Sequence, residues 1–353
     1  MWNHHVCVVL CCASACVYGQ GASAASFEGL GDLPQGAYVS VATGVSADGT
    51  AVVGYSSSEY SSEAFRWTQA TGIVGLGAFT GDDSSEACGV SADGSVVVGY
   101  TLDDADYTAF RWVAGSGMSS VGDNAKAYAV SGDGDVVVGR SNSKGFRWTA
   151  DGGMVELSDF DKARGASDDG AVIVGWSEWT YQALRWVAGH NDPDHLGGLA
   201  SEEPYSKAHA VSGDGSVVVG FSRNSNDKYE AFRWADGDGM TGLGFLSDEN
   251  AYLDSRAKAV SANGAVVVGH SQNGSGEQRA FVWDAASGMH AVTEVLTDEG
   301  VDLAGWTLTE AAGVSHDGGV IVGTGTNPEG DTEAWIATVP EPTTLAVLVP
   351  FLS

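Results

Sequence analysis

The stretch Gly44-Val45-Ser46-Ala47-Asp48-Gly49 decides the fold, because closely similar stretches return six more times along the 353 residues. The copies lie at residues 89–94, 129–134, 165–170, 210–215, 259–264 and 313–318. Their final glycines are 45, 40, 36, 45, 49 and 54 residues apart. A period of about 45 residues is typical of the blades of a β-propeller. The sequence therefore predicts seven copies of one all-β unit.

Each unit predicts four short strands, named a to d, at residues 42–46, 51–55, 63–68 and 73–77 of the first copy. Asp-Gly is expected to join strands a and b as a tight hairpin, because glycine adopts a positive φ at little cost. Strand b is rich in valine with little polar alternation, which indicates burial on both faces.

Strand c carries a recurring Ala-Phe-Arg-Trp, at residues 64–67 of the first copy. Alternation along a strand places Phe65 and Trp67 on one face and Arg66 on the other. The aromatics are expected to pack between units, and each repeated arginine to find an acidic or carbonyl partner. These arginines are Arg66, Arg111, Arg147, Arg185 and Arg233.

The two ends of the repeat region complement each other. The seventh copy has strands a, b and c but no strand d, whereas residues 27–33 resemble a strand d and precede the first strand a. We therefore predict a seven-bladed β-propeller of four-stranded blades over residues 26–338, closed by an N-terminal strand that completes blade seven. The alternative is an open solenoid, in which each end needs its own cap.

Residues 1–25 have the apolar run and small-residue cleavage site of a secretory signal peptide, so we expect a protein that is secreted or at the cell surface. Removal of that segment leaves Cys88 as the single cysteine, which excludes an internal disulfide. The chain carries 46 acidic and 16 basic residues, a net charge of −30. Such a charge disfavours nucleic acid as a partner. We expect a monomer.

The Val-Ser-x-Asp-Gly and Ala-Phe-Arg-Trp elements resemble the HAF repeats of bacterial extracellular proteins, over about residues 27–337. Residues 339–353 form a tail that opens with Val339-Pro340-Glu341-Pro342 and resembles a PEP-CTERM sorting signal. The resemblance implies export and no established chemistry. The tail lacks the basic end of that family and is shorter than the ~20 apolar residues of a membrane-spanning helix, so no stable span is expected.

Several polar motifs favour structural roles. The repeated Asp, as in Asp48, is expected to cap its own turn. The insertion from His190 to His195 contains two His and two Asp but matches no standard metal site and is interpreted as a solvated loop. Calcium is the metal that suits the acidic run Asp103-Asp104-Ala105-Asp106, on composition alone. No other cofactor is expected, and no Gly-x-Ser-x-Gly nucleophile motif occurs.

The candidate site gathers at the entrance to strand a, which is innermost in a propeller closed in this way. Six basic residues flank the first Ala of that strand in units three to six, with a Tyr and a His in equivalent positions. The set is Lys126, Tyr128, Lys162, Arg164, Lys207, His209, Arg256 and Lys258. The b–c loops open on the same face and carry Tyr60, Tyr107, Trp179, Tyr181 and Tyr229.

This pattern predicts a positive arc on a negative protein, suited to an anionic glycan or another extracellular matrix component. The alternative is that each cation pairs with a nearby acid: Asp123, Asp159, Asp161, Glu202 or Asp254. We therefore weigh two functions. One is a non-enzymatic binding or scaffold propeller that recognises an anionic extracellular polysaccharide or matrix partner. The other is a propeller-type carbohydrate-active enzyme, either a glycoside hydrolase or a polysaccharide lyase.

Overall fold

The computed structural model describes residues 24–34, 39–57, 61–103, 106–200, 202, 204–247 and 253–339. Most of the expected signal peptide, Tyr60, Asp104 and the tail beyond residue 339 lie outside the described residues. Within the described ranges, no helix is long and apolar enough to cross a membrane.

The protein is all-β and propeller-like, and five of its sheets contain four strands hydrogen-bonded in chain order. One comprises β6 (Ser84–Val90), β7 (Val96–Asp103), β8 (Asp106–Val113) and β9 (Gly117–Asp123). The next comprises β10 (Ala125–Val130), β11 (Val137–Ser141), β12 (Lys144–Thr149) and β13 (Gly153–Glu156). It is followed by β14 (Lys162–Ala166), β15 (Val172–Ser177), β16 (Gln182–Val187) and β17 (Asp194–His195). The fourth contains β18 (Ser206–Val211), β19 (Val217–Arg223), β20 (Tyr229–Ala235) and β21 (Gly239–Gly242). The fifth contains β22 (Ser255–Val260), β23 (Val266–Gln272), β24 (Gln278–Asp284) and β25 (Gly288–Ala291).

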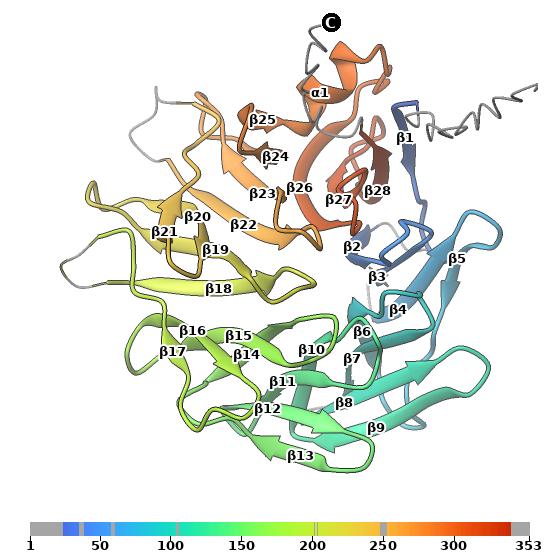
Figure 1. Cartoon of the computed structure of the whole chain (residues 1–353). Coiled ribbons are helices and arrows are strands. Elements are labelled where there is room, and N and C mark those ends of the chain that lie inside the picture. The colour runs from blue at the N-terminus through green and yellow to red at the C-terminus, as the bar shows by residue number, and fades with distance from the viewer. Residues whose placement is uncertain are drawn as a thin grey trace, which may run out of the picture.

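An eight-stranded sheet joins the first and last units. It contains β2 (Val39–Val45), β3 (Ala51–Ser57), β4 (Ser62–Thr68) and β5 (Gly72–Gly75), together with β26 (Thr307–Val314), β27 (Val320–Thr326) and β28 (Thr332–Thr338). The N-terminal strand β1 (Ser26–Gly29) pairs antiparallel with β28, and Phe27 lies opposite Ala337. β1 is shorter than the strand expected at residues 27–33. Figure 1 shows the sheets following one another around a central region.

Valine-rich strand b is buried on both faces, as predicted. Val52 and Val53 of β3 are both fully buried, and the same holds in the other units. The glycine that ends each run is required by close packing: a Cβ on Gly54 would lie 1.9 Å from the carbonyl oxygen of Val41 and 3.0 Å from the Phe65 ring. Phe65, opposite Gly54 in β4, can therefore fill the core.

The a–b turns are capped by the repeated Asp, which confirms its structural role. In the first unit, the buried Ser46 hydroxyl donates to Asp48 Oδ1 at 2.7 Å and accepts from the Ala51 N–H. The Thr50 N–H also donates to Asp48. Equivalent bonds recur in every other unit, with Asn263 replacing the Asp in the sixth.

The repeated arginines join neighbouring units. Arg66 Nε donates to the carbonyl of Gly94, in the a–b turn of the next unit, at 2.9 Å. Arg111 and Arg233 make the corresponding bonds to Gly134 and Gly264, and Arg185 instead bonds Asp194. The expectation of an acidic or carbonyl partner is thus confirmed at these four positions. It is not borne out at the Nε of Arg147, which is buried without a hydrogen-bond partner.

Backbone hydrogen bonds between consecutive a–b turns form a second connection. The N–H of Ala47 donates to Ala92, Ala92 to Gly132, Asp133 to Asp168, Asp168 to Gly213, and Ala262 to His316. The N–H of His316 in turn donates to the carbonyl of Ala47 at 3.0 Å, which links the last unit to the first.

One short helix, α1 (Val292–Asp298), was not expected from the sequence and lies between β25 and β26. Its Val292 and Leu296 are fully buried in a core that also contains Trp335 of β28. Phe27 of β1 packs on the same core, with ring centroids 5.2 Å from Trp306 and 6.2 Å from Trp335. The helix therefore thickens the core against which the N-terminal strand packs.

Candidate functional site

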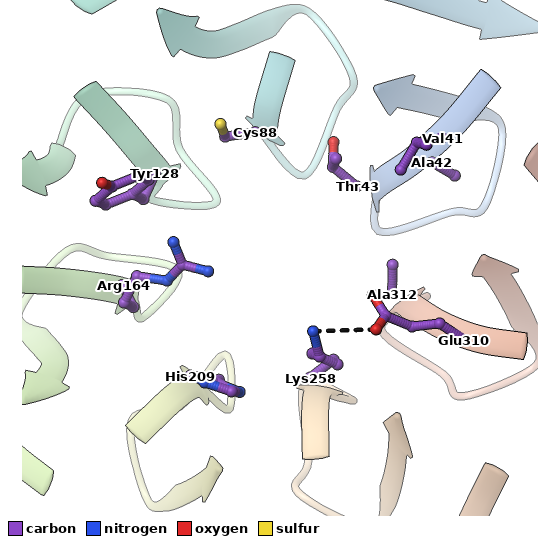
Figure 2. A pocket seen from close by; sticks show the side chains of 10 residues that line it. All are labelled: Val41, Ala42, Thr43, Cys88, Tyr128, Arg164, His209, Lys258, Glu310 and Ala312. Carbon is purple, nitrogen blue, oxygen red and sulfur yellow. Dashed lines mark ion pairs between the residues drawn. The ribbon is translucent and has the colours of Figure 1, made fainter. Parts of the chain in front are cut away.

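The innermost strands surround a pocket of about 220 Å³, seen in Figure 2. One residue from each of the seven strands a lines it. These are Thr43 from β2, Cys88 from β6, Tyr128 from β10, Arg164 from β14, His209 from β18, Lys258 from β22 and Ala312 from β26. Val41, Ala42 and Glu310 complete the wall.

β-bulges aim these seven side chains at the pocket. In β10 the register with β11 shifts between Ala127 and Ala129, so Tyr128 has no partner in the ladder. The same shift falls on the equivalent residue of every other strand a. A bulge adds one unpaired residue and bends the strand, which re-aims its side chain. The neighbouring Ala residues, such as Ala127, stay buried in the sheets.

The eight predicted residues separate into two tiers. Tyr128, Arg164, His209 and Lys258 come together in the pocket. Lys126, Lys162, Lys207 and Arg256 precede them by two residues and do not line that pocket. They form an outer tier, in which each cation lies against aromatic rings.

Aromatic contacts fix the outer tier. Lys126 Nζ lies 4.1 Å from the Tyr100 ring centroid and 3.5 Å from that of Tyr107. Arg256 lies 4.6 Å from Phe221 and 5.4 Å from Tyr229. Such cation–π contacts hold positive charge without neutralising it. Two of the predicted loop aromatics, Tyr107 and Tyr229, thus take part.

Trp176 in β15 gathers three cations around one indole ring. Lys162 lies 5.2 Å from the ring centroid, Lys207 4.9 Å and Arg164 5.8 Å. The loop aromatic Trp179 is 89% exposed and offers a ring face nearby in the chain, whereas Tyr181 stacks on Tyr205 with ring centroids 6.1 Å apart.

Acidic partners compensate only part of the arc. Lys207 pairs with Glu178 at 3.2 Å and Lys258 with Glu310 at 3.1 Å. Arg256 pairs with Asp254 at 2.8 Å, the one predicted acid that does so. Within the part of the chain that the structure describes, no carboxylate forms an ion pair with Lys126, Lys162 or Arg164.

A fourth uncompensated cation, Arg140, was missed by the sequence analysis. It lies in β11 directly opposite Lys126. Its Nη2 bonds Ser143, but its Nε is buried without a hydrogen-bond partner. Burial, followed by the charge of Arg140, lowers the pKa of Lys162, while the charge of Glu178 acts in the opposite direction.

Burial shifts the pKa of two pocket side chains, His209 and Cys88, away from neutral pH. Burial, then the charges of Arg164 and Lys258, lower the pKa of His209 to about 3. Its Nδ1 lies 2.8 Å from the carbonyl oxygen of Ala257, so this nitrogen must carry the proton. Burial raises the pKa of the Cys88 thiol to about 12.

Glu310 remains ionised in the pocket wall. Burial alone would raise its pKa, but a hydrogen bond from His270 and the charge of Lys258 together lower the pKa to about 2. His270 Nδ1 lies 2.9 Å from Glu310 Oε2. The Lys258–Glu310 pair is the dashed contact in Figure 2.

Thr43, Cys88 and Glu310 were not predicted, because the candidate site was built on the Lys and Arg residues with the Tyr and His in equivalent positions. Alignment of the repeats places Thr43 and Cys88 in the same position as Tyr128, and this was the available signal. For metals, no group of three or more His, Cys, Asp or Glu side chains that would hold an ion occurs among the described residues. In the 190–195 insertion, Asp194 is engaged with Arg185.

No protein-family model and no curated protein matches the chain. Among solved structures, the fold is similar to an oligogalacturonate lyase in complex with manganese, with a TM-score of 0.58, 13% identity, and coverage of 91% of this chain and 98% of the lyase. It is also similar to the β-propeller domain of the Trilobed protease from Pyrococcus furiosus, with a TM-score of 0.56, 12% identity, and coverage of 86% and 94%. A third match, TolB from Acinetobacter baumannii, has a TM-score of 0.49 and 12% identity over 67% of this chain. The chain spans 62% of the length of that TolB.

At such identities the likeness shows the fold alone. Fold and site together define a propeller-like β-protein with a cationic, aromatic-lined face around its central pocket.

Proposed function

We propose that this chain is an exported seven-bladed β-propeller, secreted or held at the cell surface, that binds an anionic extracellular glycan without transforming it. Pairing of β1 with β28 supports closure of the ring, as does the hydrogen bond from His316 to Ala47. Export rests on the resemblance to HAF repeats, with a signal peptide at residues 1–25.

One observation carries the binding role. Lys126, Arg140 and Lys162 form no ion pair with a carboxylate among the described residues, in a protein of net charge −30. Cations held close together repel one another, so a bound anion would stabilise this cluster more than it would an isolated cation. The rings of Tyr107 and Trp176 hold Lys126 and Lys162 in place, and exposed Trp179 supplies a face on which a sugar ring stacks.

The titration properties of the pocket favour binding over catalysis. General acid–base catalysis works best with groups whose pKa lies near the working pH. The pKa of His209 is about 3, that of Glu310 about 2 and that of Cys88 about 12. None of these three groups exchanges a proton readily at neutral pH.

Binding to polyuronates, sulfated glycans and neutral dextran, measured by biolayer interferometry with the full chain, tests the proposal. We expect binding to the acidic polymers only, weakened by salt. Replacing Lys126 and Lys162 together by Ala should reduce affinity on the order of tenfold.

Arg279→Ala is the matched control, because Arg279 is already paired with Glu277 at 2.7 Å. Equal binding to dextran, or unchanged binding by the double variant, overturns the proposal. Release of shorter products from the polymer overturns its non-enzymatic part.

A further inference from the structure

The central channel is obstructed at its a–b turn end. The middle residue of the repeated Ser-x-Asp is small in five units: Ala47, Ala92, Gly132, Gly213 and Ala262. The two exceptions are Asp168 and His316, and their side chains meet, with Nε2 and Oδ1 3.3 Å apart.

These two residues belong to turns that are not adjacent. Hydrogen bonds between consecutive turns link Asp168 to Gly213 and Ala262 to His316, so the turns of units five and six separate the two. On the other side, the turns of units one to three separate them. The Asp168–His316 contact therefore crosses the interior of the ring of turns and obstructs that end, which leaves the strand-a entrance as the open side.

Arg164 is the one pocket cation held ready for an anion. Its guanidinium lies 4.6 Å from the Tyr128 ring centroid, a contact that orients it but accepts none of its N–H groups. Lys258, the other pocket cation, is occupied by Glu310. Figure 2 shows Arg164 directed toward the middle of the pocket.

One acceptor lies beside this cation, on the neighbouring strand β18, and another lies across the pocket on β26. Because the Nδ1 of His209 donates to Ala257, its Nε2 carries a free lone pair and accepts a hydroxyl proton. The carboxylate of Glu310 offers a second acceptor in the wall. A site that offers the planar guanidinium of Arg164 to an anion, and acceptors for hydroxyl groups at His209 and Glu310, suits a hydroxylated carboxylate.

We propose that the pocket is an end-on subsite for one hydroxylated carboxylate residue, with the carboxylate on Arg164 and a hydroxyl on His209. This inference rests on the proposed glycan-binding function and specifies it: an acidic chain presents its terminal residue to the pocket while the outer tier holds the residues behind. A volume of about 220 Å³ is below the range of about 300–1,000 Å³ typical of drug-sized ligands, so it suits a single sugar unit. The same chemistry is offered by a free sugar acid.

Calorimetry of the full chain with D-glucuronate tests the subsite, with D-glucose as the neutral counterpart. We expect glucuronate to bind and glucose not to. Arg164→Ala should weaken glucuronate binding on the order of tenfold or more, and Arg164→Lys should recover only part of it because lysine lacks the planar fork. Arg279→Ala, which alters a cation outside this face that is already paired with Glu277, should leave glucuronate binding unchanged. Equal binding of glucose, or an unchanged Arg164→Ala variant of native circular dichroism, overturns the inference.

A length series separates end-on from lateral binding and the two ligand sources. Uronide oligomers that are longer than the pocket and the outer tier together should all bind with the same affinity, when they are compared at equal molar concentration of chain ends. Stoichiometry should remain one protein per chain end. Affinity that keeps rising with length, with several proteins per chain, contradicts the end-on subsite while leaving the proposed glycan binding intact. Binding of the monomer without any oligomer assigns the pocket to a free sugar acid and overturns the glycan proposal instead.

Discussion

Replacement of Phe27 by Ala tests whether the N-terminal strand closes the ring. Truncating a fully buried Phe to Ala costs about 3–5 kcal/mol. Phe27 is half-buried, which reduces this to about 2 kcal/mol, and its contacts with Trp306 and Trp335 add about 0.5 kcal/mol each. The sum is about 3 kcal/mol, and at roughly 2 °C per kcal/mol for a large domain the expected fall in Tm is about 6 °C.

Differential scanning calorimetry measures the fall, and hydrogen exchange locates it. Exchange should quicken first at β28 amides, because β1 covers that edge. Val155→Ala is the matched control, since Val155 is 58% exposed on the edge strand β13. A Phe27→Ala variant no less stable than this control, with unchanged exchange in β28, would refute the assignment of β1 as the closing strand.

Three further predictions concern the repeat and the pocket. Gly54→Ala should lower the free energy of unfolding, measured in urea, by about 3 kcal/mol or more, because the new Cβ would lie 1.9 Å from the Val41 oxygen. Gly44→Ala is the control, since its Cβ would lie 3.6 Å from the nearest atom. Equal stability of the two variants contradicts the packing argument. Ser46→Ala should cost about 1–3 kcal/mol because it removes the acceptor of the buried Ala51 N–H, whereas removing the exposed Ser119 hydroxyl should be nearly neutral. An unfolded histidine titrates near about 6.5, so the unfolded chain binds a proton that native His209, with its pKa lowered to about 3, does not. The stability that comes from neutral His209 is complete above about pH 6.5 and is lost as pH falls toward about 3. His209→Gln should therefore make Tm depend less on pH in that window. Protonation of native His209 near pH 6.5 in an NMR titration contradicts the prediction.

The sequence predicted the repeated turn, the buried valine strands and the inner position of strand a, because these depend on local chemistry repeated in every unit. It brought Tyr128, Arg164, His209 and Lys258 to one place for the same reason. It did not predict which cations are neutralised. Lys207 is paired by Glu178 from a loop of the preceding unit, and Lys258 by Glu310 from the next unit.

Those partners lie 29 and 52 residues away, and only three-dimensional proximity reveals them. Of the acids expected to pair, Asp161 illustrates the difficulty, since its carboxylate instead accepts the Glu178 N–H at 2.7 Å. Helix α1 was missed because seven residues are too few for helical periodicity to stand out.

The bulge in each strand a assigns the packing of the sheet and the lining of the pocket to different residues. Residues on either side of the bulge, such as Ala127 and Ala129, are paired in the sheet, whereas the bulged residue is unpaired and its side chain lines the pocket. The seven bulged positions already hold Thr, Cys, Tyr, Arg, His, Lys and Ala within one fold. The bulged side chains can therefore be substituted one at a time, which changes the chemistry of the pocket while the packing of the sheets behind it stays the same.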